Sequence, residues 1–232
     1  MFAIVPAAGN SVRMEIDGSK LLQEILPGTT VFEATLKSLN DSGAVQGFVI
    51  PCKDEDREKF TEICKGLNLE NFTVINGGEN RQESVFKALE ALPEHAEHVL
   101  IHDAARPLCP SSMIRAVAKS GIENGASLLA VKANSTLKIV SESPKRVVRE
   151  TIPREAIWEA QTPQVFATSL LIAAHQKAIK DSFDATDDCM LLERLGHVVN
   201  VVEGSPLNIK VTTKEDLQNA QLIANGLIAK AQ

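Results

Sequence analysis

Small residues followed by two basic residues near the N-terminus have the types and spacing to bind phosphate. Residues 4–20, IVPAAGNSVRMEIDGSK, begin with an apolar run that predicts a short buried strand, which breaks at a proline and a glycine. Small side chains after the strand would let backbone N–H groups approach a nucleotide closely. These small residues are Ala7, Ala8 and Gly9. Arg13 and Lys20 would add fixed positive charge, so the stretch predicts an anion site at a strand end.

This loop matches neither of two common phosphate-binding fingerprints. Both G-x-G-x-x-G and G-x-x-x-x-G-K-[ST] are absent, and Gly9 is followed by Asn10, Ser11 and Val12. The same residues could simply end a strand, with Arg13 and Lys20 as solvated surface cations. The loop alone leaves both interpretations open.

Four further polar stretches follow or adjoin predicted strands. They are residues 77–84 (GGENRQES), 102–107 (HDAARP), 161–164 (QTPQ) and 208–212 (NIKVT). Each has an ordinary structural explanation, since Asn80 could cap a helix and Asp103 could form a structural ion pair with Arg106. A doubly wound sheet, however, gathers the loops after its parallel strands at one edge. We therefore expect these stretches to lie together.

The elements that must position these residues alternate along the chain. Helices are predicted over residues 31–39, 54–65, 81–92, 111–121, 167–180, 187–194 and 214–229. Further strands are predicted over residues 45–50, 72–75, 98–102, 127–131 and 198–202. Because parallel neighbours require crossover helices, this alternation predicts an α/β fold with a mostly parallel sheet and helices on both faces.

Residues 133–154 interrupt the alternation. They are polar, carry several lysines and arginines, and alternate around a turn at Ser143 and Pro144, which predicts a β-hairpin arm with little core. A two-stranded hairpin is marginal in water, so the arm predicts contact with a second copy of the chain and hence a homodimer. A flexible surface excursion is the alternative. Residues 1–232 are otherwise predicted to form a single domain.

Composition and charge argue against several classes of protein. The chain has 232 residues, 44% of them hydrophobic, and a formal net charge of -6, which argues against nonspecific nucleic-acid binding. Four cysteines have neither metal-ligand nor disulfide-framework spacing and are predicted to be reduced and buried; they are Cys52, Cys64, Cys109 and Cys189. No signal peptide or membrane-spanning run is recognisable, so we expect a soluble cytoplasmic protein without membrane contact.

The ordered motifs carry a more specific resemblance. VPAAG with the following Arg13 and Lys20, then GGENRQES, HDAARP, QTPQ and NIKVT, resemble the cytidylyltransferases that act on 2-C-methyl-D-erythritol 4-phosphate in the nonmevalonate isoprenoid pathway. The resemblance covers nearly the whole chain, and HDAARP is its most discriminating part. It implies a Rossmann-like nucleotidyltransferase fold, a homodimer built by a β-arm, and Mg²⁺ bound mainly by the phosphates of CTP. It also implies cytidylyl transfer from CTP to the sugar-alcohol phosphate, with release of pyrophosphate.

The resemblance also implies roles for individual residues. Catalytic roles fall on Arg13, Lys20, Arg154 and Lys210. Nucleotide-binding roles fall on Ala7, Ala8, Gly9, Gly78, Glu79 and Ser84. Substrate-binding roles fall on Asp103, Arg106, Thr136, Thr162 and Thr186. Thr136 and Arg154 would reach the substrate from the arm of the other subunit.

Three serines depart from the family pattern, and alternatives remain. Ser11, Ser19 and Ser135 stand where the family usually has glycine, often proline, and commonly aspartate, respectively. A related ribitol 5-phosphate cytidylyltransferase is the nearest alternative, but it typically has glycine in place of Ala8 and valine in place of Ala105. The absence of G-x-G-x-x-G argues against a nucleotide-dependent oxidoreductase. A noncatalytic nucleotide-binding protein is the other alternative.

Overall fold

The core of the molecule is a mixed seven-stranded sheet in the order β11-β7-β10-β6-β1-β4-β5. The computed structural model describes residues 1–9, 19–142 and 144–231. The strands are β1 (Phe2–Ile4), β4 (Gly47–Cys52), β5 (Phe72–Asn76), β6 (His98–Ile101), β7 (Ala126–Lys132), β10 (Trp158–Ala167) and β11 (Asn200–Glu203). All neighbouring strands are parallel except β10, which is antiparallel to both β6 and β7. The predicted mostly parallel α/β sheet is confirmed.

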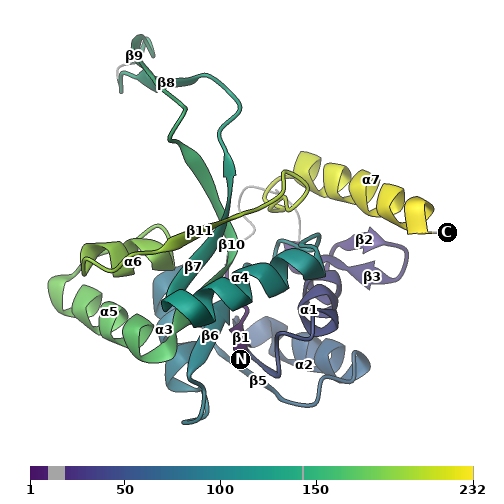
Figure 1. Ribbon diagram of the computed structural model, residues 1–232. Coiled ribbons are helices and arrows are strands. Elements are labelled where there is room, and N and C mark those ends of the chain that lie inside the picture. The colour runs from purple at the N-terminus through teal and green to yellow at the C-terminus, as the bar shows by residue number, and fades with distance from the viewer. Residues whose placement is uncertain (10–18, 143, 232) are drawn as a thin grey trace.

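Helices cover both faces of this sheet (Figure 1). One hydrophobic cluster joins it to α1 (Val31–Asp41), α2 (Arg57–Gly66) and α4 (Ser111–Asn124). A second cluster on the opposite face includes α3 (Arg81–Glu90), α5 (Thr168–Asp181) and α6 (Asp188–Arg194). Ala3 belongs to the first cluster and Ile4 to the second, because successive side chains of a strand point to opposite faces. Burial on both faces explains why β4 and β6 are nearly continuous apolar runs.

A small second sheet and two short helical turns lie outside the main sheet. The two-stranded sheet of β2 (Glu24–Leu26) and β3 (Thr29–Thr30) contacts α7 (Lys214–Ala231), and η2 (Lys20–Leu22) and η3 (Asp54–Asp56) are 3₁₀ turns. Thr213 accepts a hydrogen bond from the backbone N–H of Asp216 at 3.1 Å, so the predicted start of α7 is confirmed.

A separate hairpin projects from the body of the molecule (Figure 1). Its antiparallel strands are β8 (Leu137–Val140) and β9 (Val148–Ile152), which lie within the predicted arm. Val147 and Val148 are more than half exposed, at 57% and 54%. A hairpin with exposed valines has a face that a second chain can cover, although dimerisation stays a prediction.

Sequence reasoning placed QTPQ beside a strand or turn, and this was wrong. These residues lie inside β10, the longest strand of the sheet, because Pro163 is accommodated where the pairing with β7 shifts register between Ala160 and Gln164. The strand predicted to stop before Pro51 also continues through it to Cys52, and the Pro51 carbonyl accepts a hydrogen bond from the Ala7 N–H at 2.8 Å. In both strands proline is compatible with the sheet because its carbonyl remains available.

Candidate active site

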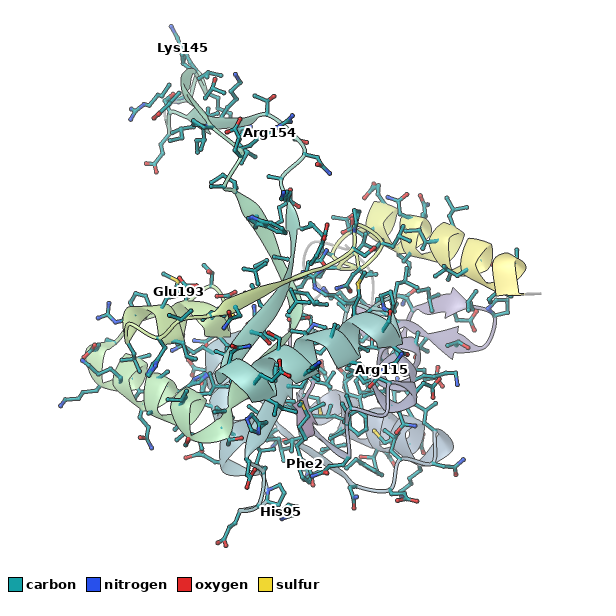
Figure 2. All side chains as sticks on the ribbon, in the orientation of Figure 1. Phe2, His95, Arg115, Lys145, Arg154 and Glu193 are labelled. Carbon is teal, nitrogen blue, oxygen red and sulfur yellow. The ribbon has the colours of Figure 1, made fainter. Side chains whose placement is uncertain are left out.

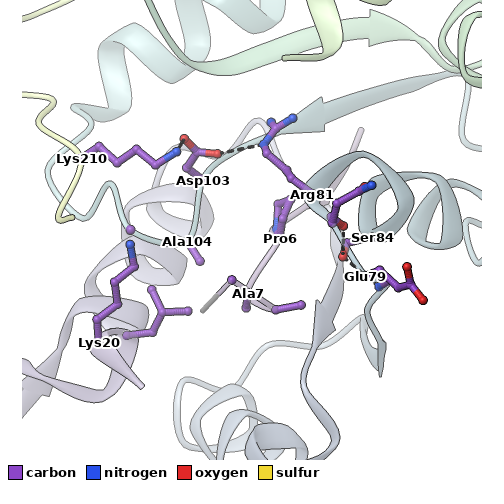
Figure 3. A pocket seen from close by; sticks show the side chains of 15 residues that line it. Pro6, Ala7, Lys20, Glu79, Arg81, Ser84, Asp103, Ala104 and Lys210 are labelled. Atoms are coloured by element: carbon purple, nitrogen blue, oxygen red, sulfur yellow. Dashed lines mark hydrogen bonds and ion pairs between the residues drawn. The ribbon is translucent and has the colours of Figure 1, made fainter. Parts of the chain in front are cut away.

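The loops that follow β1, β5 and β6 line one pocket at an edge of the sheet (Figure 3). Its volume is about 350 Å³. All the residues predicted to bind nucleotide line it, namely Ala7, Ala8, Gly9, Gly78, Glu79 and Ser84. Lys20, Asp103 and Lys210 line the same pocket. The structure therefore brings four of the five predicted stretches together around one cavity, namely residues 4–20, 77–84, 102–107 and 208–212.

The loops after β1 and β5 meet closely because Gly77 has no side chain. A Cβ atom at Gly77 would lie 2.5 Å from the Ala8 Cβ and 3.0 Å from the Ser84 Oγ, and the first distance is a clash. Ser84 Oγ accepts a hydrogen bond from the Gly78 N–H at 2.9 Å and donates one to the Asn80 carbonyl at 2.8 Å. Ser84 thus holds the glycine loop in shape at the pocket wall.

Asp103 is the centre of the charged groups in the pocket. Its Oδ2 lies 2.8 Å from Lys210 Nζ and 3.6 Å from Arg106 Nε, and its Oδ1 lies 3.4 Å from Arg81 Nε. Lys210 and Arg81 approach it from opposite sides (Figure 3). Burial alone would raise the pKa of the Asp103 carboxyl, but the attraction of Lys210, Arg81 and Arg106 outweighs burial and lowers it well below its usual range. Asp103 is therefore a fixed negative charge that orients cations.

A hydrogen-bonded chain behind Asp103 fixes its backbone. His102 Nε2 lies 3.1 Å from the Arg106 carbonyl, which can only accept, so Nε2 carries the proton. His102 Nδ1 must then accept from Thr162 Oγ1 at 3.0 Å, and Thr162 Oγ1 accepts from the Asp103 N–H at 3.0 Å. Burial lowers the pKa of His102 to about 4, which keeps the ring neutral at pH 7. Thr162 in β10 thus supports the loop that carries Asp103.

The NIKVT segment is held from two sides, which places Lys210. Asn208 Nδ2 donates to the Gln161 side chain at 3.1 Å and to the Thr162 carbonyl at 2.9 Å. Arg106 donates to the Asn208 carbonyl at 2.7 Å. At the other end, Lys20 Nζ donates to the Val211 carbonyl at 2.9 Å. The pocket therefore depends on contacts between the two ends of the chain.

Some predicted site residues do not line this pocket. Arg106 and Thr162 lie behind it and act on Asp103 through the contacts above. Thr136 and Arg154 are exposed, and Arg154 lies on the projecting hairpin (Figure 2), where it donates to the Asn134 carbonyl. Thr186 is exposed before α6 and lies 3.8 Å from Met190 Sδ.

Arg13 lies outside the described residues. The roles assigned to Arg13 and to the other predicted site residues stay predictions.

Sequence reasoning missed Arg81, which lines the pocket as the first residue of α3. Its Nη1 donates to Asp188 Oδ2 at 2.7 Å, in addition to the Asp103 contact. Burial alone would lower the pKa of Arg81, but Asp188 and then Asp103 outweigh it and raise that pKa. A cation in the first turn of a helix opposes the helix dipole, and this was the available signal that Arg81 needs acidic partners.

Carboxylates, thiols and imidazoles do not cluster for a metal within the described part of the chain. There, no three His, Cys, Asp or Glu side chains are arranged to hold an ion. Across the same residues, no helix is both long and apolar enough to cross a membrane.

An α/β sheet whose strand-end loops form a pocket of small residues and paired charges is typical of nucleotide-binding enzymes of the Rossmann-like class. The family model for 2-C-methyl-D-erythritol 4-phosphate cytidylyltransferase matches residues 1–225. The chain belongs to this family.

Individual relatives and solved structures agree with the family match. The family's enzyme from Dictyoglomus thermophilum is 38% identical over 231 residues, which cover 99% of this chain and 96% of that protein. The enzyme of the same name from Prochlorococcus marinus is 40% identical over 96% of this chain and 98% of its own. A crystal structure of 4-diphosphocytidyl-2C-methyl-D-erythritol synthase from Anaerococcus prevotii superimposes with a TM-score of 0.82 and 29% identity, covering 97% of each chain.

Proposed function

We propose that this chain transfers the cytidylyl group of CTP to 2-C-methyl-D-erythritol 4-phosphate, giving 4-diphosphocytidyl-2-C-methyl-D-erythritol and pyrophosphate. The observation that carries the proposal is the pocket in which the small-residue loop, Lys20, Asp103 and Lys210 meet. Membership of the cytidylyltransferase family over almost the whole chain supports the choice of reaction.

The chemistry suits a pocket of this kind. A phosphate monoester has its second pKa near 6, so the substrate phosphate is largely dianionic at neutral pH and needs no general base. One of its oxygens forms a bond to the α-phosphorus of CTP, and the bond from that phosphorus to the bridging oxygen of pyrophosphate breaks in line. The main obstacle is the repulsion between two polyanions. Catalysis therefore rests on positioning and on fixed positive charge.

We assign the positive charge at the reacting phosphates to Lys20 and Arg13. Lys20 lines the pocket, and its hydrogen bond to Val211 directs its ammonium group toward the segment that carries Lys210. We assign the phosphate of the sugar alcohol to Lys210, which is paired with Asp103. The small loops at Ala8 and Gly78 leave room for the nucleotide.

We also propose that the reaction uses Mg²⁺ held mainly by the phosphates of CTP. Asp103 is already paired with three cationic side chains, so its carboxylate suits an orienting role better than a metal site. Mg²⁺ commonly keeps several waters and binds substrate phosphates with few protein ligands, which fits this pocket. When bound, the ion would neutralise charge on the triphosphate and on the leaving pyrophosphate.

The projecting hairpin is proposed to pair two copies of the chain. Thr136 and Arg154 lie on or beside it and do not line the pocket of their own chain, so they would serve the pocket of the partner. At a sugar-phosphate concentration well below the raised KM of Arg154→Ala, mixing Lys20→Ala chains with Arg154→Ala chains should then restore activity, because a mixed dimer contains one intact site. Lack of any recovery, in mixtures shown to exchange subunits, would contradict this arrangement.

The four free, buried cysteines suit a reducing compartment, and we place the enzyme in the cytoplasm on that basis. Measuring the reactivity of these thiols in protein isolated without reductant would test this placement. Disulfide formation under those conditions would argue against it.

Pyrophosphate release with CTP and Mg²⁺ tests the proposed reaction directly. We expect release when methylerythritol phosphate is supplied and none when ribitol 5-phosphate is supplied. Release only with ribitol 5-phosphate would keep the mechanism and overturn the substrate. If the protein binds CTP but releases no pyrophosphate with either sugar-alcohol phosphate, a noncatalytic nucleotide-binding protein would be favoured.

A further inference from the structure

Arg81 is held between two carboxylates. Its Nε faces Asp103 Oδ1 at 3.4 Å, and its Nη1 faces Asp188 Oδ2 at 2.7 Å. Because Arg81 begins α3, the helix dipole repels its charge, and these carboxylates are what stabilise the guanidinium in this position. The contact with Asp188 is the shorter of the two, so Asp188 is the stronger restraint.

Among the described residues, Arg81 is the pocket-lining side chain that Asp188 contacts. The Asp188 side chain is only 1% exposed and does not line the cavity. Its other oxygen, Oδ1, lies 3.2 Å from Nε2 of the fully buried His175, whose ring stacks on Phe86 with centroids 5.7 Å apart. Helices α3, α5 and α6 therefore converge on one carboxylate, which is fixed by packing as well as by hydrogen bonds.

We propose that Asp188 is a positioning residue for the reaction: it holds Arg81 from behind and so leaves Asp103 Oδ2 to Lys210. The inference rests on the proposed function. It adds to that function Asp188, a residue of α6. Asp188 contacts Arg81, Arg81 contacts Asp103, and Asp103 contacts Lys210.

Loss of Asp188 should disturb one substrate more than the other. An arginine that loses one carboxylate partner tends to form a bidentate ion pair with the remaining carboxylate. Arg81 would then compete with Lys210 for Asp103. Lys210 is assigned to the sugar phosphate, whereas the nucleotide is assigned to the loops around Ala8 and Gly78. Recognition of the sugar phosphate should therefore suffer while CTP binding is largely kept.

Asp188→Asn is the first variant, because asparagine keeps the size of the side chain and removes its charge. We expect the KM for methylerythritol phosphate to rise about tenfold or more, with the Kd for CTP, measured by calorimetry, changing by less than about threefold. A purely structural role would lower the melting temperature and leave both constants unchanged below it. Unchanged constants would overturn the proposal.

Asp181→Asn is the matched control. Asp181 lies in α5 and, like Asp188, is contacted by two basic side chains, here Lys177 at 2.6 Å and Arg194 at 3.1 Å, neither of which lines the pocket. Its KM values should equal those of the wild type. An equal rise in both variants would show a general effect of charge and overturn the specific role of Asp188.

Comparing Arg81→Met with the double variant tests whether Asp188 acts through Arg81, and this comparison does not need Asp188→Asn to fold by itself. In the Arg81→Met background no buried cation is left for Asp188 to hold, so adding Asp188→Asn should change the KM for the sugar phosphate by less than about twofold. A further tenfold rise would show that Asp188 acts independently of Arg81 and would refute the proposal. Wild-type protein that releases no pyrophosphate would instead refute the proposed function.

Discussion

Thr162→Val removes the hydroxyl group that joins Asp103 to His102 while keeping the branched shape of the side chain. In the wild type, Thr162 Oγ1 accepts from the Asp103 N–H and donates to His102 Nδ1, each at 3.0 Å. Valine can do neither. The variant therefore isolates the hydrogen-bonded chain behind the pocket from the packing of β10.

The expected cost follows from the two groups that lose a partner. Thr162 is 4% exposed and His102 is 0% exposed, so water cannot replace the hydroxyl without moving the strand. Each buried polar group left without a partner costs about 1 to 3 kcal/mol, and the extra methyl group of valine returns up to about 1 kcal/mol. We expect the free energy of unfolding to fall by about 3 kcal/mol.

Urea unfolding at pH 7.5 measures this change, since His102 is neutral there in both the folded and the unfolded chain. The slope m should stay equal to that of the wild type, so that the shift in midpoint reports stability alone. Thr162→Ser is the control. It keeps the hydroxyl and loses one methyl group, and should cost only about 1 kcal/mol.

Two results would refute the reasoning. A loss below about 0.5 kcal/mol in Thr162→Val would mean that the two buried groups find other partners or need none. Equal losses in the valine and serine variants would mean that packing of the methyl group, and not the hydroxyl, is what stabilises the Asp103 loop.

Three further predictions concern charge. Lys20→Ala should remain folded and lose about a hundredfold to a thousandfold in kcat, the usual effect of removing one donor to a developing charge, and normal turnover would contradict its assignment. Arg154→Ala should raise the KM for the sugar phosphate with CTP binding retained; weaker CTP binding alone would speak against its role. Because the folded protein holds His102 neutral down to about pH 4 while the unfolded chain takes up a proton near pH 6.5, stability should fall by about 3 kcal/mol as pH drops through that interval. Urea unfolding at several pH values should show a smaller fall in His102→Gln, and an identical fall would contradict the linkage.

The sequence allowed most of the sheet and one wall of the pocket to be predicted. Apolar patterning located β4, β5 and β6 and the helices between them; β4 and β6 are nearly continuous buried runs, whereas β5 lies at the edge of the sheet and is partly exposed. The loops at Ala8, Gly78 and Asp103 then had to lie near one another, because they follow strands that are parallel neighbours.

Other features depended on contacts that no local pattern contains. β10 is polar where it passes behind Asp103 and includes Pro163, so it resembles a turn although it is the longest strand. Arg81 and Asp188 are 107 residues apart and look like ordinary helix-start residues until the fold joins them. The resemblance to a family supplied residue roles, but it gave no indication that Thr162 acts from behind the pocket.

The hydrogen bond from the Lys20 ammonium group to the Val211 carbonyl joins residues that are 191 positions apart. This separation has a consequence for the chain during its synthesis. Most of the sheet, including β1, β4 to β7 and β10, is encoded before residue 168 and can begin to assemble while translation continues. Lys210 emerges from the ribosome much later. A nascent chain can therefore build most of the sheet and the nucleotide loops, but it cannot complete the pocket until Lys210 and Val211 have also been made.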